Sequence, residues 1–204
     1  MEICNYQNYG TSQGIFEGET LNDFKDWAGE GKKFSSELEG WTAENPTAAS
    51  NLPKQADVSD YPVTFIRWHG AKAFAEYYNL ELHTEAQWEC AAKGGQNFKF
   101  AVHDGEDYED ANWNKLGLGT VALGHVLNVK QGKSNPYGLY NLAGNAWEWV
   151  YDNYTEPLST EAVIDPLIEL SNSTVRSWRG GAWNYHLQTL QTSIRYYDEE
   201  DRGN

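Results

Sequence analysis

The side chains best suited to recognition chemistry follow a glycine turn near the end of the chain. Arg179-Gly180-Gly181-Ala182-Trp183 leads into a segment that mixes aromatic rings with amide, imidazole and guanidinium groups. Such side chains combine a large contact area with hydrogen bonds, and an arginine fork suits a carboxylate. The residues that we expect to bind a ligand are Trp183, Asn184, Tyr185, Arg195 and Tyr196. In the alternative interpretation, apolar members such as Leu187 and Leu190 are core and the polar ones face water.

Residues that could carry out catalysis are scarce. Cys90 lies beside Ala86 and Ala91 in an expected helix, where a small buried hydrophobe is a better interpretation than a nucleophile. The five histidines show no short metal-ligand spacing, and the chain has neither a Gly-x-Ser-x-Gly elbow nor a phosphate loop. The residue types therefore indicate no catalytic site.

The length and charge of the chain restrict its class. A chain of 204 residues suits one sizeable core, so we expect a single domain over 1–204. The net charge of −15 leaves no basic face for a phosphate backbone, which argues against nucleic acid as a partner. A solvated acidic surface is the simplest interpretation, and a cation or a cationic partner is the alternative.

No apolar run approaches the ~18 residues of a membrane span. The first residues lack an export signal, and Cys4 and Cys90 leave the redox compartment open.

Few regular elements are expected to position these side chains. In chain order we expect a helix at 21–28, a strand at 62–66, a helix at 68–78, a helix from Thr84 to Gly94 and, over 175–183, a strand that enters a glycine turn. Thr84 and Gln87 have the spacing of a capping box, and Gly94-Gly95 provides a stop. Residues 96–134 are typical of a loop, with an acidic patch at 104–110. The central core is expected to contain Trp147, Trp149, Trp178 and Trp183.

Three motifs in a fixed order resemble the formylglycine-generating enzyme family, also called the sulfatase-modifying factor family. They occupy 82–95, 135–149 and 179–183, and His83 stands where the family has proline. The resemblance covers residues 60–200, roughly, and a strand-like segment at 2–6 resembles the family's early strand. It implies an α+β, formylglycine-generating-enzyme-like fold, related to the C-type lectin fold, with low regular secondary structure. Family members usually extend further in both directions, so we expect a chain truncated at both ends.

The resemblance also implies a calcium site. Carried over residue by residue, its ligands are the side-chain oxygens of Asn141 and Glu148 and the backbone carbonyls of Gly144 and Ala146. Such oxygens suit a hard cation. The alternative is that the asparagines only hydrogen-bond the turn. A second family site would begin at Asn112 but finds no aspartate between 121 and 124, and the acidic patch is a weaker substitute.

The oxidising members of the family use two thiolates after the glycine turn to bind copper(I), a soft metal. The corresponding positions here hold Tyr185 and Leu190, so copper is not expected. We therefore expect a domain that lacks the catalytic cysteine pair and is a calcium-stabilised module binding a peptide, protein or glycan ligand. Two alternatives stay open: a formylglycine-generating oxidase acting on sulfatase cysteine, and a variable binding protein of a diversity-generating retroelement.

Overall fold

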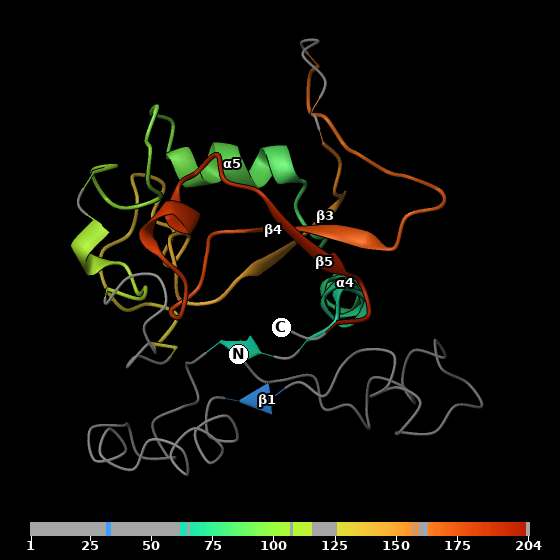
Figure 1. Cartoon of the computed structure of the whole chain (residues 1–204), viewed down its shortest axis with the longest axis horizontal. Coiled ribbons are helices and arrows are strands. Elements are labelled where there is room, and N and C mark those ends of the chain that lie inside the picture. The colour runs from blue at the N-terminus through green and yellow to red at the C-terminus, as the bar shows by residue number, and fades with distance from the viewer. Residues whose placement is uncertain are drawn as a thin grey trace. The chain divides into compact units, whose positions relative to one another are not determined.

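The computed structural model describes residues 32–33, 62–64, 66–106, 108–115, 126–156, 158 and 163–202 (Figure 1). The helix expected at 21–28, the strand-like segment at 2–6 and Cys4 lie outside these residues. Among the described residues, 63–82 and 199–202 form one compact unit together with Lys32–Lys33, while 62 and 83–198 form another. The single domain stays a prediction. No helix in the described part of the chain is long and apolar enough to cross a membrane.

The first unit contains a short strand pair and one helix. Strand β1 (Lys32–Lys33) pairs antiparallel with β2 (Val63–Thr64), and helix α4 spans Trp68–Tyr77. The helix buries Trp68, Ala73 and Ala75. Trp68 and Ala75, seven residues apart, lie on one side as the amphipathic spacing predicts, whereas Ala73 lies about 140° around the helix from Trp68. Both the helix and the strand are confirmed, although the strand is shorter than the apolar run.

Helix α5 (Glu85–Lys93) of the second unit begins and ends where its sequence signals lie. The Thr84 hydroxyl accepts from the Gln87 amide at 3.2 Å, and the Gln87 side chain accepts from the Thr84 amide at 3.0 Å. Gly94 ends the helix with φ 59°, and a Cβ there would lie 2.7 Å from Pro136 Cδ. Both the left-handed backbone and the nearby proline therefore require glycine.

A three-stranded sheet accompanies this helix in the order β3-β4-β5, as Figure 1 shows. The strands are β3 (Glu148–Asn153), β4 (Val175–Arg179) and β5 (Tyr196–Glu199). Strands β3 and β4 are antiparallel, with Trp149 opposite Trp178, and their register shifts between Trp149 and Asn153. Strand β4 ends at the glycine turn, as the sequence predicts. Helix α5 packs on β3 and β4.

The hydrophobic core of this unit is centred on α5 and the loops rather than on the tryptophans of the two glycine motifs. It contains Trp88, Ala92, Phe100, Ala101, Val102, Leu142, Ala143, Val150 and Leu190. Trp149 and Trp178 are buried as expected, but Trp147 and Trp183 are only half-buried. The prediction of a four-tryptophan core is thus right for the strand tryptophans and wrong for the other two.

Cys90 corrects a second expectation, because its side chain is exposed. Trp88 and Ala92, four residues apart, face the core. Cys90 follows Trp88 by two residues, which is about 200° around a helix, so it faces away from the core. Its neighbours in sequence are small, but its helical phase places it in solvent.

Candidate functional site

The loop that carries the predicted calcium ligands is held by backbone contacts that only glycine allows. Gly144 has φ 81°, and its amide donates to Gly180 O at 2.7 Å. A Cβ at Gly144 would lie 2.1 Å from Asn112 O, a distance that carbon and oxygen atoms cannot share. The two glycine motifs therefore meet through their backbones, and any other residue at position 144 would clash with the backbone of Asn112.

The amide side chain of Asn145 fixes the same loop to its neighbours. Its Oδ1 accepts from the Leu127 amide at 2.7 Å and from Asn112 Nδ2 at 3.1 Å, and its Nδ2 donates to Leu127 O at 3.1 Å. Asn145 is 3% exposed, so these bonds satisfy a buried polar group. The turn-holding role considered for the asparagines from sequence thus applies to Asn145.

Asn141 and Glu148 differ from Asn145 in the contacts that they leave open. Asn141 uses Nδ2 to donate to Asn128 O at 3.2 Å, and within the described residues nothing donates to its Oδ1. Glu148 accepts from Trp88 Nε1 at 2.6 Å and has no cationic partner among the described side chains. Burial raises the pKa of Glu148 to about 7, and the Trp88 hydrogen bond opposes that shift. An amide oxygen and an uncompensated carboxylate are donor types that fit calcium.

The second predicted cation site finds less support. The side-chain amide of Asn112 donates to Asn145 Oδ1 at 3.1 Å. Positions 121–124 lie outside the described residues. In the acidic patch, Asp104 accepts from the Glu106 amide and Glu109 binds Lys115. Across the residues that the structure describes, no three His, Cys, Asp or Glu side chains are grouped so as to hold a metal.

Two of the five predicted ligand residues come together around Trp147. The Trp147 ring lies 5.2 Å from Tyr185 and 5.0 Å from Tyr196, and the two tyrosine rings are 6.3 Å apart. The Trp147 Nε1 is buried without a partner in the described part of the chain. We call Trp147, Tyr185 and Tyr196 the aromatic cluster. Its rings offer a partly exposed apolar surface with phenol groups, which is suited to recognition.

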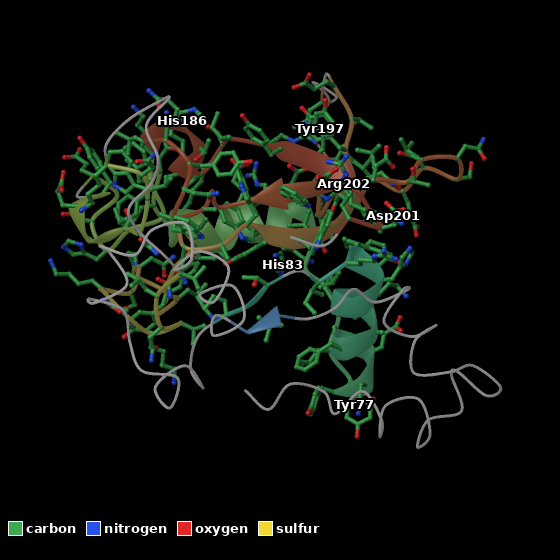
Figure 2. The ribbon with its side chains drawn as sticks, turned by 60° about the horizontal axis from the view of Figure 1, so that its bottom comes forward. Tyr77, His83, His186, Tyr197, Asp201 and Arg202 are labelled. Atoms are coloured by element: carbon green, nitrogen blue, oxygen red, sulfur yellow. The ribbon has the colours of Figure 1, made fainter. Side chains whose placement is uncertain are left out.

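The remaining predicted ligand residues lie outside this cluster. Asn184 is exposed, while Trp183 is half-buried, donates through its amide to Asn145 O at 3.1 Å and makes no ring contact within the described residues. Figure 2 shows His186 and Tyr197, both from the segment after the glycine turn, well apart from each other. The polar side chains of this segment therefore do not all face one pocket.

Arg195 is held by the protein itself. Its Nε and Nη2 donate to the two carboxylate oxygens of Glu85 at 2.7 and 2.8 Å, and its Nη1 donates to Thr155 O at 2.7 Å. The guanidinium also lies over the Tyr154 ring, 4.7 Å from its centroid. These contacts use the guanidinium N–H groups that the sequence analysis assigned to a ligand carboxylate. The binding of a ligand by Arg195 stays a prediction.

Glu85 belongs to a buried ion-pair network that sequence reasoning missed. Arg179 is fully buried, lies 3.5 Å from Glu85 and 2.7 Å from Glu89, and donates to Thr192 O and Ile194 O. Burial lowers the Arg179 pKa, and the two carboxylates oppose that shift. The available signal was the i,i+4 spacing of Glu85 and Glu89 on α5, which places both carboxylates on one helix face.

The two positions that correspond to the family's thiolates do not fit copper(I). Leu190 is 0% exposed and belongs to the hydrophobic core, and Tyr185 belongs to the aromatic cluster. An alkyl group and a phenol offer no soft ligand. Cys90, the cysteine that the structure describes, lies on α5.

Comparison with known proteins identifies the family. The model of the sulfatase-modifying factor enzyme 1-like domain matches residues 16–204. The serine/threonine-protein kinase pkn1 of Chlamydia pneumoniae is 32% identical over 138 residues, which are 67% of this chain and 21% of that protein. The formylglycine-generating enzyme of Bos taurus is 32% identical over 136 residues, 62% of this chain and 36% of that protein. The chain therefore spans well under half the length of these relatives.

A solved structure agrees with this assignment at the level of the fold. Treponema denticola variable protein 1 superposes with a TM-score of 0.62 at 21% identity, covering 75% of this chain and 71% of that one. The predicted α+β, formylglycine-generating-enzyme-like fold with low regular secondary structure is confirmed. By its sequence motifs, its glycine turns and the extent of the family match, the chain belongs to the sulfatase-modifying factor, or formylglycine-generating enzyme, family.

Proposed function

We propose that this chain is a member of the family that does not oxidise cysteine and acts instead as a calcium-stabilised module for binding a peptide, protein or glycan. The observation that carries the proposal is the identity of the residues at the two thiolate positions, Tyr185 and Leu190. Leu190 packs in the core, so that position has become part of the hydrophobic interior. Without a pair of soft ligands, these two positions cannot bind copper(I).

The calcium part of the proposal is supported by the unmatched donors of the 141–148 loop. Asn141 and Glu148 would supply side-chain oxygens, and Gly144 and Ala146 would supply carbonyls. Calcium supplies positive charge, and the buried Glu148 carboxylate has no other source of it among the described residues. The ion would hold the loop that links the two glycine motifs.

The binding part of the proposal is supported by the aromatic cluster. Tyr196 is 38% exposed, and Tyr185 is half-buried against the Trp147 ring, so the cluster offers rings to solvent beside the exposed Asn184. Rings next to amides are typical of surfaces that recognise peptides or sugars.

A mass-spectrometric assay tests the catalytic part. A sulfatase-type cysteine peptide is incubated with the chain, copper and reductant, and a formylglycine-generating enzyme serves as positive control. We expect no mass change from thiol to aldehyde. Conversion by this chain would contradict the proposal, and its loss in Cys90→Ser would identify the thiol involved.

Thermal unfolding tests the calcium part independently. Calcium that binds only the folded chain raises the melting temperature as its concentration rises. We expect this shift in the wild type and its loss in Glu148→Gln, which keeps the size of the side chain. An unchanged melting curve in excess chelator would contradict calcium binding and leave the catalytic part standing.

The formylglycine-generating oxidase remains the second candidate, because the bovine enzyme is 32% identical to this chain over the matched region. The same peptide assay decides between them. A variable binding protein is the third candidate. This candidate is supported by the fold that the chain shares with Treponema denticola variable protein 1. Its test is genomic: a template repeat and a reverse-transcriptase gene should lie beside the coding sequence.

A further inference from the structure

A cleft of about 670 Å³ lies between α5 and the segment that follows β3. Its wall on the side of that segment is apolar and consists of Leu158, Val163, Pro166, Leu167 and Ile168. We call this space the α5 cleft. We propose that it docks a cationic amphipathic segment of a partner protein, whose apolar side chains pack on this wall while lysine or arginine side chains meet carboxylates at the rim.

The apolar wall is anchored through its backbone at Ile168. Asp152 on β3 accepts from the Ile168 amide at 3.0 Å and from the Glu85 amide at 2.7 Å, which ties the wall and the start of α5 to one carboxylate. Asn153 accepts from the Leu170 amide at 2.8 Å, and its own amide donates to Ile168 O at 2.9 Å. Figure 1 shows residues 163–174, in orange, leading back to β4. These bonds fix the Ile168 end of the wall against β3 before a partner arrives, which lowers the entropic cost of binding.

The side chains of this segment expose more apolar surface than scattered single residues would. Val163 is 60% exposed, Ile164 is 96% exposed, and Leu158 and Leu167 are each 48% exposed. Contiguous exposed apolar side chains mark interaction surfaces in folded proteins, whereas isolated ones need no explanation. A volume of about 670 Å³ also falls in the range of ligand-binding clefts.

Charge selects the occupant. The cations at the cleft are already paired within the chain, Lys93 with Glu89 and Arg195 with Glu85. Asp165 and Glu169 do not line the cleft but are the sequence neighbours of two lining residues, Pro166 and Ile168. Asp165 receives a hydrogen bond from Gln87 Nε2 at 3.2 Å, and Glu169 receives one from the Tyr151 hydroxyl at 3.3 Å. These donors are neutral, and neither carboxylate has a cationic partner among the described residues.

The net charge of the chain adds to this selection. At −15 it repels a second copy and any anionic surface, and it attracts a cationic segment. Only Arg195, among the five residues predicted to bind a ligand, lines the α5 cleft. The cleft is thus a second surface, and its occupation does not depend on calcium or on the aromatic cluster.

The experiment uses a fluorescent amphipathic peptide of lysine and leucine with helical spacing. Controls are a scrambled peptide of the same composition and the matching peptide of glutamate and leucine. Fluorescence anisotropy should show binding of the first peptide alone, with affinity falling as salt rises. Leu167→Asp should weaken binding at least roughly tenfold, because it places a charge in the apolar wall. Leu139→Asp is the matched control, since Leu139 is 40% exposed outside the cleft, and it should change nothing.

Two further measurements sharpen the test. Asp165→Asn and Glu169→Gln should each weaken binding roughly two- to fivefold, the size expected for exposed charge pairs. Because Cys90 lines the cleft, bound peptide should slow its alkylation by iodoacetamide, read by mass mapping separately from Cys4.

The proposal is overturned by any of the following results. The wild type does not bind the lysine–leucine peptide, or binds the glutamate–leucine peptide equally well. Leu167→Asp binds as the wild type does, or Cys90 is alkylated at the same rate with and without peptide. A dimer seen by sedimentation that Leu167→Asp dissociates would assign the cleft to a second copy instead.

Discussion

Neutralising Glu85 should destabilise the fold more than neutralising any carboxylate on the surface. Glu85 is 7% exposed, and its carboxylate bonds Arg195 at two points, lies 3.5 Å from Arg179 and accepts from the Ser177 hydroxyl at 3.2 Å. Glu85→Gln keeps the size of the side chain and removes its charge. Arg195 would then lose its carboxylate partner, while Arg179 would keep Glu89, which also pairs with Lys93.

The size of the effect follows from burial. Removing one partner of a buried ion pair costs about 3–5 kcal/mol, because the other charge is left without compensation. That is a large part of the ~5–15 kcal/mol of a typical domain. Glu76→Gln is the matched control, since Glu76 pairs with Lys72 on the exposed side of α4 and should cost no more than about 0.5 kcal/mol.

Urea unfolding followed by tryptophan fluorescence measures both variants. The double variant Glu85→Gln with Arg195→Met removes one charge of each sign and should recover part of the lost stability, as a double-mutant cycle would show. The double variant also keeps the test possible if the single variant does not fold. Equal urea midpoints for Glu85→Gln and Glu76→Gln would refute the argument that the Glu85 ion pairs contribute more to stability than an exposed pair.

Three further predictions concern single positions. Gly144→Ala should cost far more stability than Gly138→Ala, because both have positive φ but only the first places a Cβ against Asn112 O; equal urea midpoints would contradict the backbone contact. Leu190→Ala should cost about 2–5 kcal/mol in the same assay, as expected for a core residue, and an unchanged midpoint would return that position to a binding surface. Burial lowers the His83 pKa below its ordinary 6.5, so the unfolded chain takes up this proton first and stability is lost as pH falls below 6.5; His83→Pro, the residue typical of the family, should flatten that part of the pH profile.

The sequence signals that held were local ones. The capping box at Thr84, the stop at Gly94 and the spacing of α4 each involve residues a few positions apart, where the chain itself determines the geometry. The exposure of Cys90 could also have been derived, because Trp88 and Ala92 define the buried face of α5 and Cys90 lies opposite them. The presence of small neighbours was the weaker guide.

The features that could not be predicted depend on pairs distant in sequence. Glu85 and Arg195 are 110 residues apart, and the local sequence around either residue does not predict that the two form a pair. The same holds for the α5 cleft, which requires Asp152 to bind the wall segment and the start of α5 at once. Motif resemblance identified the fold, but residue pairing across the fold decided which side chains remain available to a ligand.

The asparagine side chains that bind loops have a consequence for the dynamics of the backbone. Asn145 accepts from the Leu127 amide, and Asn135 accepts from the amides of Tyr137 and Leu139, although none of these three donors belongs to a helix or strand. Asn135 and Asn145 are each 3% exposed, so opening these bonds requires the surrounding core to open as well. Slow hydrogen exchange should therefore extend into segments drawn as loops, and the part of the molecule that behaves as rigid on that timescale is larger than its ribbon of helices and strands.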